Sequence, residues 1–349
     1  MSEILYQSHL ISIIVPIRNE EVIIEEVLHS LKEQSLPATI EIEIILIDGL
    51  SDDRTLDIIN EFKKANLDIN IKILTNKKKH IPNALNIGLQ ESSGFYVCRI
   101  DAHTIYPRDY IKNCYETITK TNADNVGGYI ITKKFNNSLE ANVVQSVVTH
   151  KFGVGNSGFR VGREDGLVDT VPFGFFKRNI FDKVGMFNEK LIRAQDYEMN
   201  RRIVNEGGKI WFSNKIYSTY YNQKSFIAFL KKQFFFEAPY NIYMWYLAPY
   251  TLAVRHGITL FFSSGVIIGL FIKDISILRE IYFLVLILYC TLALISSLQQ
   301  SIRFKNPILF PILPLCFFSF HFIHGLGMIL GLTKLVLRVA PVQKKSINF

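Results

Sequence analysis

Asp101 and His103 are the residues of this chain whose types and spacing most directly suggest chemistry. They lie two positions apart in the segment RIDAHTIYP. In an extended chain, side chains at i and i+2 point the same way. A carboxylate and an imidazole placed like this can share one divalent cation, Mn²⁺ or Mg²⁺, whose remaining positions are filled by phosphate and water. By itself, a D-x-H pair favours a turn with an incidental histidine, so the metal site depends on its context.

Asp48 is a second candidate, because it ends the apolar run IEIEIILI and is followed by a glycine and a Ser-Asp cluster. A carboxylate at the end of a parallel strand can accept hydrogen bonds from a nucleobase or a ribose. Helix N-capping is an equally good explanation, and Ser51 and Asp53 fit it well. The spacing alone does not separate the two interpretations.

Asp196 is a third candidate and lies in QDYE, before a segment that predicts a helix, a Gly-Gly stop and a strand. A carboxylate near a helix start and facing a cleft can act as general base for an incoming hydroxyl. The alternative is N-capping, with Glu198 favourable to the helix dipole.

The elements that must position these residues alternate regularly over the first hundred residues. Four apolar runs, at 11–17, 40–47, 71–75 and 95–101, are separated by helical patterns. This rhythm predicts an α/β fold with a mostly parallel, Rossmann-like sheet and right-handed crossovers. Ligands bind at the carboxyl ends of such strands. The polar residues that fall at these ends are Arg18, Asp48, Asn76 and Asp101.

The C-terminal third has a different composition. Residues 226–256 are rich in Trp, Tyr and Phe, which favours amphipathic helices at the membrane interface over an ordinary core helix. Apolar runs follow at 257–272, 281–302 and 306–333, and a membrane-crossing helix needs about 20 apolar residues. The third run holds several prolines, which predict a kink or a re-entrant hairpin.

Basic residues on both sides of the third run bear on its topology. The link at 303–305 and the segment after 333 carry lysine and arginine without acidic residues. The positive-inside rule places both in the cytoplasm. Two full spans followed by a proline-broken hairpin satisfy this rule, whereas three simple spans conflict with it.

Charge and cysteine content restrict the class of protein. The net charge is +8, hydrophobic residues make up 49% of the chain, and the mean hydropathy is +0.19. A basic chain suits an anionic membrane surface or a phosphate-rich ligand. No nucleic-acid-binding motif is present, so we expect no nucleic-acid partner. The four cysteines form no C-x-x-C pair, which indicates a reducing compartment.

The motifs together resemble family 2 glycosyltransferases with the GT-A nucleotide-sugar fold, and more narrowly the ExoA-like branch of succinoglycan-type enzymes. The D-A-H triplet is the specific part, because most relatives carry D-x-D there. The resemblance covers roughly residues 10–235. The matching segments are VPIRNEE at 15–21, LIDGLSDDRT at 46–55, RIDAHTIYP at 99–107, FGVGNSGFR at 152–160, DTVPFGFFKR at 169–178 and VGMFNEKLIRAQDYEMNRRI at 184–203.

The resemblance implies a role for each matching residue. Asp101 and His103 would hold the metal and diphosphate, and Asp196 would be the catalytic base. The donor nucleotide-sugar would contact Pro16, Arg18, Glu20, Asp48, Asn76, Arg99 and Gln233. After Gln233 the chain continues as FFFEAP, where relatives usually have an aromatic residue and a glycine. The role of FGVGNSGFR does not follow from its residues.

The implied activity is an inverting transfer of a hexose from a donor such as UDP-glucose. The expected acceptor is a polyprenyl-diphosphate-linked saccharide at the cytoplasmic (inner) membrane. The expected organisation is a catalytic domain at 1–225 in the cytoplasm, interfacial helices at 226–256 and a membrane region at 257–349. A sugar nucleotidyltransferase is the first alternative, although VPIRNEE lacks the glycine-rich loop of those enzymes. A catalytically silent membrane scaffold is the second, and the retained acidic residues argue against it.

Overall fold

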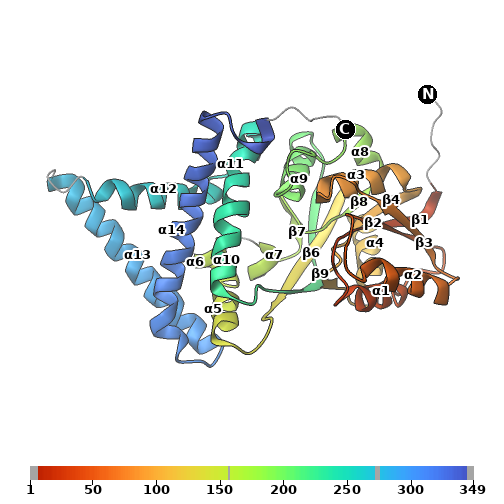
Figure 1. Ribbon diagram of the computed structural model, residues 1–349, viewed down its shortest axis with the longest axis horizontal. Coiled ribbons are helices and arrows are strands. Elements are labelled where there is room, and N and C mark those ends of the chain that lie inside the picture. The colour runs from red at the N-terminus through yellow and green to blue at the C-terminus, as the bar shows by residue number, and fades with distance from the viewer. Residues whose placement is uncertain (1–6, 156–157, 272–275, 344–349) are drawn as a thin grey trace. The chain divides into compact units, whose positions relative to one another are not determined.

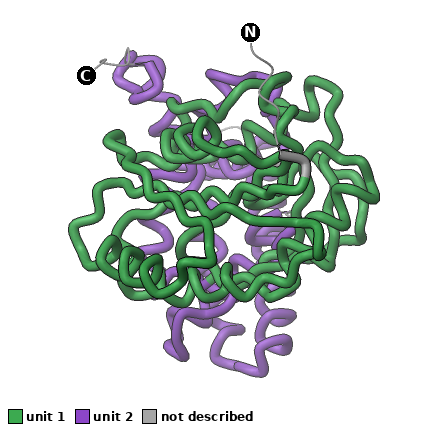
Figure 2. The backbone as a smooth tube through the Cα atoms, turned by 90° about the vertical axis from the view of Figure 1, so that its right-hand side faces the viewer, with its two compact units in different colours: residues 1–131, 162–220 green, residues 132–161, 221–349 purple. Residues whose placement is uncertain are grey.

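The computed structural model describes residues 7–155, 158–271 and 276–343. The chain forms two compact units (Figure 2). Unit 1 contains residues 1–131 and 162–220, and unit 2 contains residues 132–161 and 221–349. Residues 132–161 lie inside the expected catalytic domain of 1–225, yet they group with the C-terminal helices.

Unit 1 is built on a mixed sheet that has nine strands within the described residues, in the order β3-β2-β1-β4-β8-β6-β9-β5, with β7 paired to β9. The strands are β1 (Gln7–Ile17), β2 (Glu41–Asp48), β3 (Asn70–Thr75), β4 (Gly94–Arg99), β5 (Thr104–Ile105), β6 (Asn125–Lys133), β7 (Gly166–Leu167), β8 (Phe175–Lys177) and β9 (Ile210–Tyr221).

The predicted parallel rhythm is confirmed for the first four strands. β1 pairs in parallel with β2 and β4, and β2 pairs in parallel with β3. Asp48 is in register with Ile17 on one side and Thr75 on the other, so the carboxyl ends of these strands meet at one edge. Beyond β4 the pairings β4–β8, β6–β8, β7–β9 and β5–β9 are antiparallel. The sheet as a whole is therefore mixed, with parallel pairing among β1 to β4 and antiparallel pairing beyond β4.

Helices cover the parallel strands of unit 1. They are α1 (Ile24–Lys32), α2 (Thr55–Ala65), α3 (Ile81–Glu91), α4 (Tyr110–Thr121), α8 (Asn179–Val184) and α9 (Gln195–Asn205). The central residues of β1 and β2 are fully buried, as continuous apolar strands covered on both faces must be. α3 packs especially close to β1, since a Cβ at Gly88 would lie 2.5 Å from Ile14 Cγ2.

Apart from the last residues of β6 and β9, unit 2 is helical in the part that the structure describes. Its elements are α5 (Leu139–Val148), α6 (Lys151–Val154), α7 (Gly158–Val161), α10 (Phe226–Lys232), the π-turn η1 (Gln233–Glu237), α11 (Ala238–Leu247), η2 (Pro249–Thr251), α12 (Val254–Gly269), α13 (Ser276–Arg303), α14 (Leu309–Val336) and η3 (Pro341–Gln343). α14 contacts α5, α10, η1, α11, α12 and α13, and lies beside α10 and α11 in Figure 1. It is the central helix of the unit.

Two helices, α13 and α14, are long and apolar enough to cross a membrane by length and composition. α12 has 16 residues and is about 24 Å long, short of a hydrocarbon core of about 30 Å.

The expected proline-broken hairpin in the third apolar run is wrong, because residues 309–336 form one continuous helix. Pro307 precedes this helix. Pro311 falls in its first turn, where backbone N–H groups have no intrahelical partner in any case. Only Pro314 lies inside the helix, and it removes a single hydrogen bond.

Candidate active site

The loops after β1 and β2 are fastened to each other at the carboxyl edge of the sheet. Asn19, which has a φ of 56°, donates its backbone N–H to Ser51 Oγ at 3.0 Å. Its side chain donates to Asp52 Oδ1 at 2.7 Å and accepts from the Asp52 N–H at 3.0 Å. Glu20 donates its N–H to Thr55 Oγ1 at 2.8 Å. The acidic cluster after β2 therefore shapes the loop that carries Arg18 and Glu20.

Asp48 is buried and closes its own loop. Its carboxylate accepts from Ser51 Oγ at 2.6 Å and from the Ser51 N–H at 3.2 Å. Helix α2 begins at Thr55 and its N-cap is Arg54, so Asp48 is not the cap of that helix. A carboxylate has about four acceptor positions, so Asp48 retains capacity for a base or a ribose at the strand edge.

Asn76 uses its side-chain amide within the turn before α3. It donates to the His80 carbonyl at 2.9 Å and accepts from the Lys78 N–H at 3.1 Å. Both ends of the amide are thereby engaged in holding this turn. Burial and then the charge of Arg18 lower the pKa of His80, so the two side chains share this edge of the site.

Arg99 joins two of the candidate carboxylates. Its guanidinium is buried and donates from Nη2 to Asp101 Oδ1 at 3.0 Å and from Nη1 to Asp196 Oδ2 at 3.4 Å. Burial opposes its charge, but Asp101 and Asp196 outweigh burial and raise the pKa of Arg99. Arg99 bridges the expected metal ligand and the expected base, and its expected contact with the donor stays a prediction.

The motif DTVPFGFFKR explains how Arg99 is held. Phe173 has a φ of 61° and Gly174 a φ of 98°, and the Gly174 carbonyl accepts from the Arg99 N–H at 3.0 Å. This left-handed pair turns the Phe173 ring toward Arg99, with 5.8 Å between the guanidinium carbon and the ring centroid. A Cβ at Gly174 would lie 2.4 Å from the Phe176 ring, so glycine is required there for space as well as for φ.

The residues expected to hold the metal, Asp101 and His103, follow β4, and His103 lies beside the loop after β1 that carries Glu20. The Asp101 side chain is 19% exposed, and the described contacts engage its Oδ1 with Arg99. His103 is exposed, and its Nδ1 lies 3.2 Å from Glu20 Oε1. Within the described ranges no group of three or more His, Cys, Asp or Glu side chains surrounds one point. Asp101 and His103 are hard oxygen and nitrogen donors that suit Mn²⁺ or Mg²⁺, with phosphate and water completing the shell.

Asp196 is the second residue of α9 and does not cap it. The N-cap is Ala194, with a φ of 61° and no side-chain hydrogen bond. Asp196 Oδ1 accepts from the Tyr197 N–H at 2.9 Å, and its side chain is 39% exposed. The carboxylate is thus held on a rigid helix yet reachable from solvent, which suits a general base.

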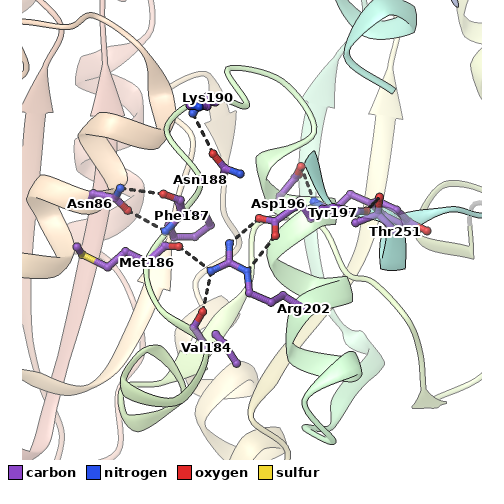
Figure 3. A network of polar contacts seen from close by, with 12 residues as sticks. Asn86, Val184, Met186, Phe187, Asn188, Lys190, Asp196, Tyr197, Arg202 and Thr251 are labelled. Carbon is purple, nitrogen blue, oxygen red and sulfur yellow. Dashed lines mark hydrogen bonds and ion pairs between the residues drawn. The ribbon is translucent and has the colours of Figure 1, made fainter. Parts of the chain in front are cut away.

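A polar network secures the loop before α9 (Figure 3). Arg202 pairs with Glu198 at 2.6 Å and donates to the carbonyls of Val184 and Met186 at 2.8 and 2.9 Å. Asn86 of α3 exchanges two hydrogen bonds of 2.9 Å with the Phe187 backbone. The sequence interpretation did not predict this network, although Glu198 and Arg202 have the i, i+4 spacing of a helical ion pair.

Gln233 belongs to unit 2, where it begins the π-turn between α10 and α11. Its contact with a donor stays a prediction. The start of FGVGNSGFR also lies in unit 2, where Phe152 packs against Phe317 and His321 of α14 with ring centroids 5.3 and 5.2 Å away. Asn156 and Ser157 of this motif lie outside the described residues.

Comparison with known proteins places the chain in a family. A model described as glycosyl transferase family 2 matches residues 12–185. A relative from Methanococcus voltae is 30% identical over 333 residues, covering 93% of this chain and 97% of the relative. It is named dolichyl N-acetyl-alpha-D-glucosaminyl phosphate 3-beta-D-2,3-diacetamido-2,3-dideoxy-beta-D-glucuronosyltransferase. The chain belongs to glycosyltransferase family 2.

One further relative and one solved structure are also similar to this family 2 enzyme, and the solved structure bears on the fold alone. The succinoglycan biosynthesis protein ExoA of Rhizobium meliloti is 27% identical and covers 64% of this chain and 66% of the relative. The mannosyltransferase PcManGT of Pyrobaculum calidifontis, solved with GDP-Man and Mn²⁺, aligns with a TM-score of 0.58 and 15% identity. That alignment covers 96% of this chain and 89% of the solved one. The expected GT-A fold and glycosyltransferase activity are confirmed, which removes the nucleotidyltransferase and silent-scaffold alternatives.

Proposed function

We propose that this family 2 glycosyltransferase transfers a hexose from a UDP-sugar such as UDP-glucose to a polyprenyl-diphosphate-linked saccharide, with inversion at the anomeric carbon. The reaction would take place at the cytoplasmic face of the cell membrane, during synthesis of a cell-surface polysaccharide. The proposal rests on one observation. The two terminal nitrogens of the Arg99 guanidinium form ion pairs with Asp101 and Asp196, one nitrogen with each carboxylate. This junction supports the proposal that Asp101, as a metal ligand, and Asp196, as a base, belong to one site.

Asp196 is the proposed base. As the acceptor oxygen forms its bond to the anomeric carbon, the bond from that carbon to the diphosphate oxygen breaks, and Asp196 takes the hydroxyl proton. Its Oδ2 is oriented by Arg99 and its Oδ1 by the Tyr197 N–H, so the carboxylate is preorganised. Attack opposite the leaving diphosphate converts an α-linked donor into a β-linked product.

Asp101 and His103 are the proposed ligands of Mn²⁺ or Mg²⁺, which when bound supplies positive charge for the diphosphate leaving group. Asp48 would accept hydrogen bonds from the base or ribose. Pro16, Arg18 and Glu20 would line the same pocket, and exposed Arg18 would approach the phosphates. Gln233 would also contact the donor.

The names of relatives support a lipid-linked acceptor. The Methanococcus voltae relative is named for a dolichyl phosphate-linked sugar, and the Rhizobium meliloti relative for succinoglycan biosynthesis. We also propose the division into a catalytic domain at 1–225, interfacial helices at 226–256 and a membrane region at 257–349. The apolar helices of the last segment would hold the enzyme at the surface where such an acceptor resides.

A donor and acceptor screen tests this function. Membranes that contain the full chain are supplied with UDP-glucose, UDP-N-acetylglucosamine or GDP-mannose, and the lipid fraction is analysed by mass spectrometry. Acceptors carried on polyprenyl diphosphate and on polyprenyl monophosphate are compared. We expect one hexose added from a UDP-sugar to the diphosphate-linked acceptor, and none with Asp196→Asn. Transfer from GDP-mannose alone, or only to soluble saccharides, would contradict the proposal.

A further inference from the structure

The apolar helices of unit 2 differ in what surrounds them. In their most apolar stretches, 17% of the residues of α13 are buried, against 50% for α14. Residues 276–292 of α13 are almost all exposed around the whole helix, whereas residues 316–331 of α14 include no exposed residue. A helix that is apolar all round and yet uncovered by protein is typical of a membrane segment. Arg279 and Glu280 lie near the start of this stretch, so its uncharged part is 281–292. That part is about 18 Å long, enough to enter a hydrocarbon core of about 30 Å but not to cross it.

The protein that covers α14 is not apolar throughout. Close approaches place α14 against η1 and α11, since a Cβ at Gly327 would lie 2.7 Å from the Phe234 carbonyl and one at Gly331 would lie 2.8 Å from Pro239 Cα. The same continuous helical segment carries Lys231 and an ion pair between Lys232 and Glu237 at 3.7 Å. If α14 crossed the bilayer, these charged neighbours would be carried into or against hydrocarbon, where charges are costly.

The last turns of α13 differ from its first half. Their buried stripe is small and polar, and consists of Ala293, Ser296, Ser297, Gln300 and Ser301. Arg303 donates to the Thr149 carbonyl at 3.0 Å, and His150 Nε2 lies 2.9 Å from Gln299 Oε1. This end of α13 is therefore joined to the turn between α5 and α6 by polar contacts, so it lies outside hydrocarbon.

α12 and α13 converge at the other end of α13, away from α14 (Figure 1). There a Cβ at Gly269 would lie 2.1 Å from the Tyr282 ring. Exposed apolar side chains on this pair include Ile268, Phe271, Ile281, Leu284 and Leu288. α12 and α13 therefore form a hairpin with an apolar surface. Its outer ends, the start of α12 and the end of α13, join the rest of unit 2.

The distribution of basic residues agrees with a hairpin. Arg303 and Lys305 lie before α14, and Lys334 and Arg338 lie at and beyond its last turn. Because α14 is one helix of about 42 Å, crossing would place these two basic groups on opposite faces, against the positive-inside rule. Both are cytoplasmic if α14 stays on the cytoplasmic side.

We infer that α12 and α13 form the membrane-inserted hairpin, and that α14 does not cross but lies on the cytoplasmic side as the protein-covered helix to which the hairpin is anchored. The occupant of the exposed hairpin surface is the lipid bilayer. The inference rests on the proposed function only in that the enzyme is membrane-bound.

Cysteine labelling tests the sidedness of α14. Exposed Cys290 is changed to Ser, and the other three cysteines are buried. Lys305→Cys and Val339→Cys then report the two sides of α14. With a membrane-impermeant maleimide, both should react in inside-out vesicles and neither in right-side-out vesicles. Reaction of the two positions from opposite faces would overturn the inference. The readout does not depend on transfer, so failure of the proposed function would be seen separately.

Spin labels at two exposed leucines test insertion. Leu284 of α13 is 64% exposed and Leu315 of α14 is 70% exposed, so they form a matched pair. A label at Leu284→Cys should be reached by oxygen and shielded from an aqueous nickel chelate, whereas a label at Leu315→Cys should be reached by the chelate. Equal access of the chelate to both labels would exclude an inserted hairpin. Transfer activity of each variant confirms that it is folded.

Discussion

Arg99 contacts two carboxylates that would have different tasks in catalysis. Asp101 is the proposed metal ligand and Asp196 the proposed base, and each binds a different guanidinium nitrogen of Arg99. A planar guanidinium with five donors can satisfy both at once, whereas an ammonium is a single point of charge. Because Arg99 is buried and held by the Gly174 carbonyl, it sets the separation of the two groups. Arg99 is thus a positioning residue.

Arg99→Lys should lower kcat by about 10–100-fold, the usual effect of losing a residue that orients a metal ligand. The donor KM should change less, because Asp48 and the loops that shape its pocket are untouched. Mn²⁺ affinity in the presence of UDP, measured by electron paramagnetic resonance, should fall as well. Exposed Arg108→Lys is the matched control and should resemble wild type. Equal behaviour of the two variants would refute the positioning role.

Asp101→Ala should abolish both turnover and Mn²⁺ binding, whereas His103→Asp should retain part of each. A carboxylate is a competent ligand for either hard cation, so aspartate can replace the imidazole. Isothermal titration with Mn²⁺ and UDP measures binding apart from activity. Full turnover in excess chelator would show that the metal assignment is wrong.

Asp196→Asn should reduce turnover by about 10²–10⁴-fold, the range for a lost general base, with little change in UDP affinity. The amide keeps the shape of the side chain but cannot take the proton. Stability should hardly change, since the N-cap of α9 is Ala194. A large loss of UDP affinity would place Asp196 in the nucleotide site instead.

The sequence identifies candidate site residues from local motifs, but it does not identify contacts between residues that are far apart in the chain. Asp101, His103 and Asp196 stand out because each lies at a strand end or helix start in a recognisable motif. The bridge from Arg99 to Asp196 spans 97 positions, and no local pattern pairs residues so far apart. Asn76 was placed correctly at a strand end, but its amide is occupied by its own turn.

At the scale of elements, a buried carboxylate connects three parallel strands. Glu43 of β2 accepts from Ser12 Oγ of β1 at 2.6 Å and from the Ser93 N–H before β4 at 2.7 Å. Lys72 of β3 lies 2.8 Å from its other oxygen. Burial raises the pKa of Glu43, but the bonds from Lys72, Ser12 and Ser93 outweigh burial, so the pKa lies below its ordinary value of 4.5.

Glu43→Gln should therefore destabilise the protein at neutral pH, by about 1–3 kcal/mol for lost charge-assisted hydrogen bonds. A lowered pKa in the folded state contributes stability that is present above about pH 4.5 and is lost as the pH falls through the folded value. Thermal melting of both proteins from about pH 3 to about pH 8 measures this, since that range extends below the ordinary glutamate pKa. The difference in Tm should be constant above about pH 5 and shrink below pH 4.5. A constant difference at all pH values would contradict the linkage.

Strand and helix order was predictable where periodicity was clear. The first four strands alternate with amphipathic helices, and their parallel pairing follows from that rhythm. The antiparallel strands β5 to β8 are only two to nine residues long and follow no such rhythm. Prolines in the third apolar run predicted a break, but their positions near the start of α14 leave the helix intact.

At the scale of the whole molecule, residues 132–161 connect the middle of the sequence to the C-terminal helices. The apolar face of α5, Val143, Val144, Val147 and Val148, packs in one cluster with Leu309, Leu313, Phe317 and Phe320 of α14. A division of the chain near residue 225 puts the two partners of this packing in different parts. The sequence alone does not show which apolar faces meet across more than 150 positions. The last part of the chain therefore helps to complete the fold of the middle part.

Ending the chain after Tyr250 should then leave unit 2 without its central helix. Several buried side chains on α5 and α10 would lose their partners, each worth about 1.5–3 kcal/mol of burial. We expect this shortened chain to aggregate and to show no UDP-induced thermal shift. In the full chain, Phe317→Ala should act in the same direction, at about 3–5 kcal/mol, whereas Leu315→Ala on the exposed side of α14 should be nearly neutral. A soluble, monomeric 1–250 chain with a normal UDP shift would show instead that the catalytic unit folds without α14.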